Sequence, residues 1–286
     1  RCGEDTVFTI TAFDKNKKRS TNGVYKVYLN NFSENQIYTG EVDLAKNNPF
    51  KIKGKLDAPG FLRVSAYSEE TKAVKHFSVG YEPEKIVKAS PSPEDFDSFW
   101  AEARAKFRKE VSFEVKMERD KKLSTQKYEF FRVSFPTYAR RIYAFLTVPT
   151  PKTKKPYPVR VGVNAAGFGD WANSIDARTN AICVQFAVYD WQMDSDWKKL
   201  KWKYEALDKE MHERYGARYC AAGITEGRES YYFYPVILGI DRAIDWIGET
   251  YNVDKSKFVY HGTSQGGGFG FYLCGLNHRF TKAVFY

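Results

Sequence analysis

A serine flanked by glycines stands where a strand-like segment meets a helix-like segment. The apolar run 258–261 predicts a strand, and residues 265–276 predict a helix. They are joined by Gly262-Thr263-Ser264-Gln265-Gly266, a G-x-S-x-G pattern in the strand–turn–helix context that it requires. The chain before and after the serine almost touches in such a turn, so side chains at positions 262 and 266 would collide. This element restricts the fold to one in which strands are followed by helices.

The segments before this element alternate in a similar way. Runs rich in apolar residues predict strands at 112–118, 128–135, 141–148, 159–164 and 181–189, and a last one at 282–286. Helices are predicted at 197–214 and 230–250, the second with an apolar stripe. Strands that alternate with helices indicate a mostly parallel sheet in three layers, covered on both faces. Residues 91–286 are therefore predicted to form an α/β domain.

Residues 1–85 have a different pattern. Short strand-like runs follow one another at 6–13, 23–30, 36–43, 50–55, 60–67 and 73–80, and none of this segment has helical periodicity. Short strands at this spacing predict a small antiparallel β-sandwich of the immunoglobulin-like kind, which would be an accessory domain. Prolines at 83, 91 and 93 mark the boundary, and Ser92-Pro93 predicts the start of a helix.

The composition limits the classes of partner. Hydrophobic residues make up 43% of the 286-residue chain and charged residues 28%, which argues against intrinsic disorder. The formal net charge is +10, but the basic residues are scattered, so we interpret them as solvated surface rather than as a nucleic-acid site. No run approaches the roughly 18 apolar residues of a membrane span. The four cysteines have no CxxC spacing, which excludes the common zinc patterns.

The predicted turn presents Ser264 as a nucleophile. Its hydroxyl would stand at the N-terminus of the following helix, where backbone N–H groups and the helix dipole favour developing negative charge. The backbone N–H of Gln265 is predicted to be one donor of an oxyanion hole. The loop after strand 159–164 supplies the second candidate, the backbone N–H of Phe168. The alternative is structural, with glycines that only allow close packing.

Residues from about 91 onward resemble the acetyl xylan esterase / cephalosporin C deacetylase family, carbohydrate esterase family 7 of the α/β-hydrolases. The similar segments are Pro-Glu-Asp-Phe-Asp-Ser-Phe-Trp at 93–100, Ala-Gly-Phe-Gly at 166–169, the helix around 231–243, and 253–267 with its Ser-Gln-Gly-Gly run. The resemblance implies an α/β-hydrolase fold and a serine esterase that removes acetyl groups from an acetylated oligosaccharide or polysaccharide. It also implies catalysis without metal or cofactor in a periplasmic or secreted protein. The leading β-domain resembles additions found in esterase-like proteins of polysaccharide-degrading gut bacteria.

Two segments depart from the family's pattern. Residues 189–194 replace the family's Arg-Gly-Gln, so its hexameric assembly is not implied here and the oligomeric state stays open. At 166–168 the His and Tyr of the family's His-Gly-Tyr-Gly are replaced by Ala and Phe. A backbone donor at Phe168 survives this change, whereas a side-chain contact to the acyl oxygen does not.

The sequence lacks a usable acid and base for the serine. In this fold a carboxylate and then a histidine follow the nucleophile. The only later histidine is His278, about 20 Å from Ser264 along a regular helix. His261 lies about 10 Å away along the strand, and His212 lacks the second histidine of H-E-x-x-H. We therefore expect the acid and base to lie beyond Tyr286 in a longer hydrolase, which would leave this chain inactive by itself.

Other interpretations of the same sequence remain open. A degenerate protein would also lack the acid and base. The same scaffold could serve a hydrolase of another specificity, such as a peptidase or a different esterase, or a non-catalytic binding protein that retains the turn only as structure.

Overall fold

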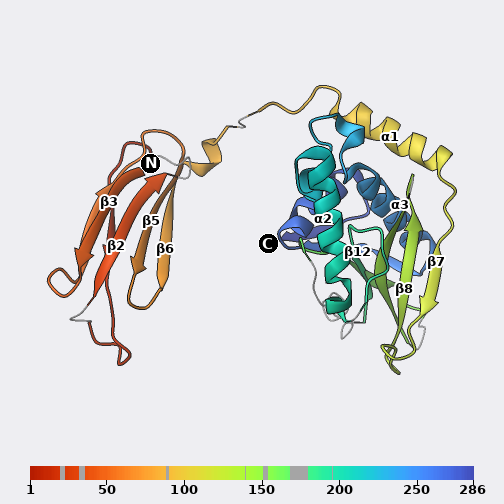
Figure 1. Ribbon diagram of the computed structural model, residues 1–286, viewed down its shortest axis with the longest axis horizontal. Helices are drawn as coiled ribbons and strands as arrows, with labels where there is room; N and C mark the ends of the chain where they lie inside the picture. The colour runs from red at the N-terminus through yellow and green to blue at the C-terminus, as the bar shows by residue number, and fades with distance from the viewer. Residues whose placement is uncertain are drawn as a thin grey trace. The chain divides into compact units, whose positions relative to one another are not determined.

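The chain falls into two units, Arg1–Ser92 and Pro93–Tyr286, each with its own hydrophobic core (Figure 1). The structure is a computed structural model, which describes residues 1–19, 23–31, 36–87, 90–138, 140–150, 154–167, 180–194 and 196–286. Ser264 and Gln265 belong to the second unit, whereas Phe168 lies outside the described residues.

Two antiparallel sheets make up the first unit. One pairs β1 (Thr6–Ile10) with β4 (Phe50–Gly54), and a short 3-10 helix, Pro83–Lys85, follows the last strand. The other has the order β3-β2-β5-β6, with β2 (Val24–Asn31), β3 (Gln36–Asp43), β5 (Gly60–Ser68) and β6 (Val74–Tyr81). Phe8 from the first sheet and Leu29 and Leu62 from the second are buried in one core. The strands therefore form close to the runs in which the sequence predicts them.

A seven-stranded sheet with the order β13-β12-β10-β11-β9-β8-β7 forms the centre of the second unit. Its strands are β7 (Lys116–Arg119), β8 (Tyr128–Pro136), β9 (Arg141–Pro149), β10 (Tyr157–Val163), β11 (Ile182–Phe186), β12 (Val253–Gly262) and β13 (Lys282–Phe285). β11, β10, β12 and β13 run parallel, and β9, β8 and β7 continue the sheet antiparallel. Every residue of β11 is buried, as expected for a parallel strand that is covered on both faces.

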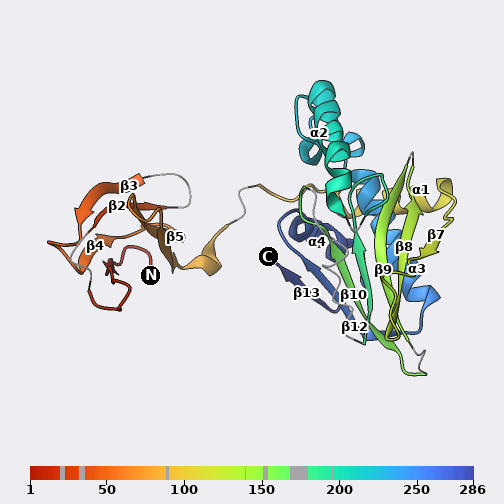
Figure 2. The same ribbon diagram turned by 60° about the horizontal axis from the view of Figure 1, so that its bottom comes forward.

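Four α-helices accompany this sheet in the described part of the unit. They are α1 (Phe96–Glu110), α2 (Lys201–Tyr215), α3 (Tyr234–Thr250) and α4 (Gln265–Leu276), with short 3-10 helices at Trp197–Leu200, Tyr219–Ala221 and Arg228–Ser230. α3 contacts β8 and β9, and α4 contacts β10, β12 and β13 (Figure 2). Since α3 and α4 also contact each other, they lie on the same face of the sheet. The predicted apolar stripe of α3, which includes Val236, Ile240 and Ile244, is buried there.

The start of α1 differs from the prediction. The Ser92-Pro93 pattern predicts a helix that begins there, but α1 begins at Phe96 with Asp95 at the N-cap position. A turn comes first, in which the Phe96 N–H donates to the Pro93 carbonyl at 3.1 Å. The Asp95 carboxylate pairs with Arg228 at 2.7 Å instead of capping the helix. Pro93 therefore shapes the turn before the helix rather than the first turn of the helix.

Charged side chains attach α1 to α3. Arg104 donates to the buried Asp241 at 2.9 Å, and Arg108 donates to Asp245 one turn further along α3. Arg279, which follows α4, donates to the same Asp245 at 2.9 Å. Burial alone would raise the pKa of Asp245, but hydrogen bonds from Arg279 and Arg108 outweigh burial and hold that pKa below its usual value. Three segments far apart in sequence thus meet at one carboxylate.

Candidate active site

The predicted turn around Ser264 has the backbone of a nucleophile elbow. β12 ends at Gly262 and α4 begins at Gln265, with Ser264 as its N-cap residue at φ 54° and ψ −118°. A Cβ added at Gly262 would lie under 3.0 Å from the carbonyl oxygen of Gly266, and one added at Gly266 would be as close to the carbonyl oxygen of Val163. Real Cβ atoms do not approach backbone this closely. The glycines are therefore required by the turn, as the sequence predicts.

Backbone hydrogen bonds hold the elbow from both sides. The Ser264 N–H donates to the Tyr286 carbonyl at 2.8 Å, and the Tyr286 N–H donates to the Gly262 carbonyl at 2.9 Å. The Gly268 N–H donates to the Ser264 carbonyl at 3.0 Å. A side-chain bond adds to these, since the hydroxyl of Tyr260 in β12 donates to the Gly266 carbonyl. These bonds fix a serine backbone in the left-handed region of φ, where a serine is strained.

Of the two predicted oxyanion donors, the structure describes Gln265 but not Phe168. Gln265 is the first residue of α4, so its N–H is one of the helix-terminal amides that have no acceptor within the helix. Phe168 lies outside the described residues, but the preceding Gly167 is described and has φ 92°. Among the described residues, no atom lies within 4 Å of a Cβ built on Gly167.

Two buried tyrosines connect Gly167 with Gln265. The Tyr219 hydroxyl lies 2.6 Å from Oε1 of Gln265 and 3.2 Å from the Tyr189 hydroxyl, which lies 2.7 Å from the Gly167 carbonyl oxygen. Each hydroxyl has one hydrogen, and both ends of this series are acceptors, so only two of the three contacts can be hydrogen bonds. The distances place the hydrogens at the two ends. On the other side, Nε2 of Gln265 donates to the Asn164 carbonyl at 3.3 Å.

The sequence did not predict these tyrosines as site residues. Burial raises the pKa of both Tyr189 and Tyr219 well above the usual tyrosine value, so both stay protonated as hydroxyl donors. Tyr189 lies at the end of the apolar run 181–189, which is the edge of the sheet where parallel strands end, and that position is a usable signal. Tyr219 lies in a short 3-10 helix, where no periodic pattern identifies it.

None of the four histidines, all of which are in the described part of the chain, is hydrogen-bonded to Ser264. His261 directly follows Tyr260 in β12, so its side chain points to the sheet face opposite α4. Burial and the charge of Arg160 lower the pKa of His261. His278 lies beyond the far end of α4, about 18 Å along a helix of this length. His212 is exposed on α2, and His76 belongs to the first unit.

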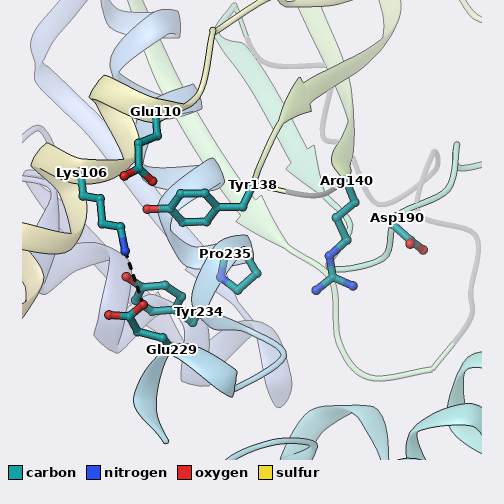
Figure 3. Close-up of a pocket in the computed structure, with 8 residues that line it drawn as sticks. All are labelled: Lys106, Glu110, Tyr138, Arg140, Asp190, Glu229, Tyr234 and Pro235. Atoms are coloured by element: carbon teal, nitrogen blue, oxygen red, sulfur yellow. Dashed lines mark ion pairs between the residues drawn. The ribbon is translucent and has the colours of Figure 1, made fainter.

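A cavity of about 560 Å³ opens elsewhere in the second unit (Figure 3). It lies between α1, the turn from β8 to β9, the segment after β11 and the start of α3. The Arg140 guanidinium on its wall lies 4.1 Å from the ring centroid of Tyr232 and donates to the Tyr232 carbonyl at 3.0 Å. The Tyr232 ring lies 5.7 Å from the ring of Tyr219. The cavity wall is therefore packed against the same aromatic group that contacts Gln265.

Two negative findings apply to the described residues only. No three His, Cys, Asp or Glu side chains among them are grouped so that they could hold a metal ion. No helix among them is both long enough and apolar enough to cross a bilayer. None of the four cysteines, all of which are described, forms a disulfide; Cys183 is buried and Cys220 is exposed.

Comparisons with known proteins identify relatives of this chain. A sequence profile of the family "Acetyl xylan esterase (AXE1)" matches residues 81–286. Acetyl esterase Axe7A from Xylanibacter ruminicola is 26% identical over 251 residues, which cover 86% of this chain and 55% of that protein. The chain thus spans about half the length of the curated relative that it matches.

Solved structures of two esterases are similar to the second unit's fold. The acetyl xylan esterase from Paenibacillus sp. R4 has a TM-score of 0.54 and 21% identity, covering 68% of this chain and 60% of that one. Acetyl xylan esterase 1 from Thermoanaerobacterium sp. JW/SL YS485 has a TM-score of 0.53 and 21% identity, covering 68% and 58%. They confirm the predicted α/β-hydrolase fold. Because the profile matches most of the chain, from before α1 to its last residue, the chain belongs to the acetyl xylan esterase family.

Proposed function

We propose that the protein is a serine esterase that removes acetyl groups from acetylated xylan or other acetylated sugars. The observation that carries the proposal is the elbow, in which close-packed glycines hold Ser264 at φ 54° at the N-terminus of α4. Membership of the acetyl xylan esterase family and the likeness to an acetyl esterase support the choice of an acetyl ester. We propose a periplasmic or secreted location, where such an esterase would meet a polysaccharide substrate.

In the proposed mechanism, the Ser264 hydroxyl attacks the acetyl carbonyl carbon and loses its proton to a general base. The N–H groups of Gln265 and Phe168 stabilise the oxyanion of the tetrahedral intermediate. The intermediate collapses, the C–O bond to the sugar breaks, and the base returns the proton to the sugar oxygen. Water then attacks the acetyl-serine by the reverse proton path and releases acetate. No step requires a metal or a cofactor.

The base and its orienting acid are proposed to come from outside these 286 residues. The reason is geometric, since a serine needs a base within about 2.6–3.2 Å and none of the four histidines contacts Ser264. The same observation favours one second candidate, a non-catalytic binding protein that retains the elbow as structure. The two candidates differ in whether Ser264 turns over an ester.

Turnover of p-nitrophenyl acetate tests this proposal. The assay compares the 286-residue chain, the natural-length gene product and the natural-length Ser264→Ala variant. We expect turnover by the natural-length protein, a loss of at least about 10³-fold in Ser264→Ala, and little turnover by the 286-residue chain. Equal turnover by wild type and Ser264→Ala would exclude the nucleophile and leave the binding protein as the better candidate. Equal turnover by the short chain and the natural-length protein would place the base within these residues.

A further inference from the structure

A cavity in the second unit has the size of a ligand site. Its volume of about 560 Å³ is within the roughly 300–1,000 Å³ typical of small-molecule sites. None of Ser264, Gln265 and Gly167 is among its described lining residues. The cavity is therefore separate from the place where an ester would react.

An aromatic ring forms part of its wall. Tyr138, in the turn between β8 and β9, is 37% exposed, and its ring packs edge-on against Phe107 with centroids 5.2 Å apart. Figure 3 shows Glu110 and Tyr234 on the hydroxyl side of this ring. Burial, and after it the charge of Glu110, raises the pKa of Tyr138, so its hydroxyl stays neutral. A partly exposed ring of this kind can pack against the C–H groups of a flat ligand while its hydroxyl makes a hydrogen bond.

The charged side chains that line the cavity include both cations and anions. Lys106 and Arg140 supply donors, and Glu110, Asp190 and Glu229 supply acceptors. A ligand with a full charge of either sign would meet side chains of like charge. A neutral ligand rich in hydroxyl groups can donate to the carboxylates and accept from the cations at once. The lining therefore fits a neutral sugar better than an ion.

The charged groups are not locked to each other. Lys106 and Glu229 form a loose pair at 3.8 Å, with side chains that are 52% and 61% exposed. Exposed pairs of this kind contribute little stability and can exchange partners with a ligand. The side chains can therefore turn toward a sugar without the loss of a strong ion pair.

A series of contacts joins the cavity wall to the elbow. It runs from the Arg140 guanidinium over Tyr232 to Tyr219 and then to Gln265, with separations of 4.1, 5.7 and 2.6 Å. Neither Ser264 nor Gln265 is among the described residues that line the cavity, so a ligand that occupies both places must extend beyond its acetyl group.

We propose that this cavity binds a neutral sugar unit of the same oligosaccharide whose acetyl group is placed at Ser264. The proposal rests on the proposed esterase function and adds a subsite that distinguishes chains from small esters. Tyr138 provides the stacking surface, and Asp190 and Arg140 provide hydrogen bonds to hydroxyl groups.

The test is a ratio of specificities in the natural-length protein. The value of kcat/KM for acetylated xylohexaose is divided by kcat/KM for p-nitrophenyl acetate, a small ester that carries no sugar. We expect Tyr138→Ala to lower this ratio about tenfold and Asp190→Ala, at an exposed side chain, about fivefold. Tyr138→Phe retains the ring, so its ratio stays within about twofold of wild type. The matched control is Tyr272→Ala on α4, where the tyrosine is 38% exposed, and its ratio should not change.

Binding of xylohexaose without acetyl groups separates the two proposals. Titration calorimetry on the Ser264→Ala protein should show binding that Tyr138→Ala weakens, whether or not Ser264 is the nucleophile. Unchanged ratios in folded Tyr138→Ala and Asp190→Ala, with Ser264→Ala inactive, would overturn the subsite and leave the esterase proposal standing. If a xylo-oligosaccharide that carries uronic acid binds more tightly than the neutral chain, the proposal that the ligand is neutral is wrong.

Discussion

The Tyr219 hydroxyl donates to Oε1 of Gln265 at 2.6 Å, although the two residues are 46 positions apart. Through this bond a short 3-10 helix holds the side chain that directly follows the elbow serine. The Tyr189 hydroxyl makes the corresponding bond to the Gly167 carbonyl at 2.7 Å. A rigid aromatic group thus lies between the two backbone segments from which the proposed oxyanion donors come.

Loss of the Tyr219 hydroxyl should reduce activity without unfolding the protein. Tyr219→Phe leaves Oε1 of Gln265 without its donor, and an unsatisfied buried acceptor costs about 1–3 kcal/mol. We expect kcat/KM of the natural-length protein for p-nitrophenyl acetate to fall about tenfold, mainly through kcat. Tyr251→Phe is the control, since among the described residues that hydroxyl makes its one hydrogen bond to the Met117 sulfur at 3.8 Å. A fall of the same size in both variants would contradict a specific role for Tyr219.

The elbow should not tolerate a single added methyl group at Gly266. Gly266→Ala places a Cβ against the Val163 carbonyl oxygen, so the backbone must shift. We expect a loss of about 2–3 kcal/mol in the free energy of unfolding. The Cβ of Gly275→Ala on the same helix meets no atom of the described residues within 4 Å beyond its own helix backbone, so this variant should be neutral or stabilising by up to about 1 kcal/mol.

Urea unfolding followed by tryptophan fluorescence measures both glycine variants. All six tryptophans lie after residue 92, so the signal reports on the second unit alone. Equal stability of the two variants would show that the elbow relaxes more easily than the contacts indicate.

The loop that carries Phe168 should contribute through its backbone. Phe168→Ala retains the peptide N–H, so we expect only a small change in kcat for p-nitrophenyl acetate. Gly167→Val forces a branched side chain onto a residue at φ 92° and should displace the loop. Loss of one oxyanion donor costs about 2.7–4 kcal/mol, or roughly 100- to 1,000-fold in kcat. A loss of that size in folded Phe168→Ala would show that the side chain, not the backbone, acts.

Asp245 should give part of the stability a defined pH dependence. Its pKa is held below the usual value in the folded protein, so its contribution is present above about pH 4 and is lost as pH falls through the folded pKa. Asp245→Asn removes one carboxylate from Arg108 and Arg279, which keep Asp241 at 3.9 Å and Glu249 at 3.2 Å, and we expect a loss of about 2 kcal/mol at pH 7. The difference in the free energy of unfolding between Asp245→Asn and wild type should become smaller as pH falls below 4.

Tryptophan-monitored urea unfolding at pH 7, 5, 4 and 3 checks this dependence. Glu205→Gln, which removes an exposed pair with Lys201, should change stability by less than about 0.5 kcal/mol at every pH. A difference for Asp245→Asn that stays constant down to pH 3 would contradict the lowered pKa.

The elements that follow from local chemistry could be predicted, and α4 is the clearest case. The predicted segment 265–276 and the observed helix Gln265–Leu276 coincide, because the turn before it allows only glycine at its two contact positions. The predicted start of α1 was wrong because the Asp95 carboxylate forms an ion pair with Arg228, a residue far along the chain. Tyr219 was missed for the same reason, since its partners are set by tertiary packing and not by periodicity.

The ion pairs between α1 and α3 have a consequence for the order of folding. Arg104 and Asp241 are 137 positions apart, as are Arg108 and Asp245. A ribosome that adds 5–20 residues per second needs about 7–27 s to reach α3 after α1 has been made. During that time the apolar stripe of α1, with Trp100 and Phe107, has no α3 to cover it. The apolar stripe of α1 is therefore uncovered by α3 in the nascent chain until α3 emerges, and a long loop must close before these ion pairs form.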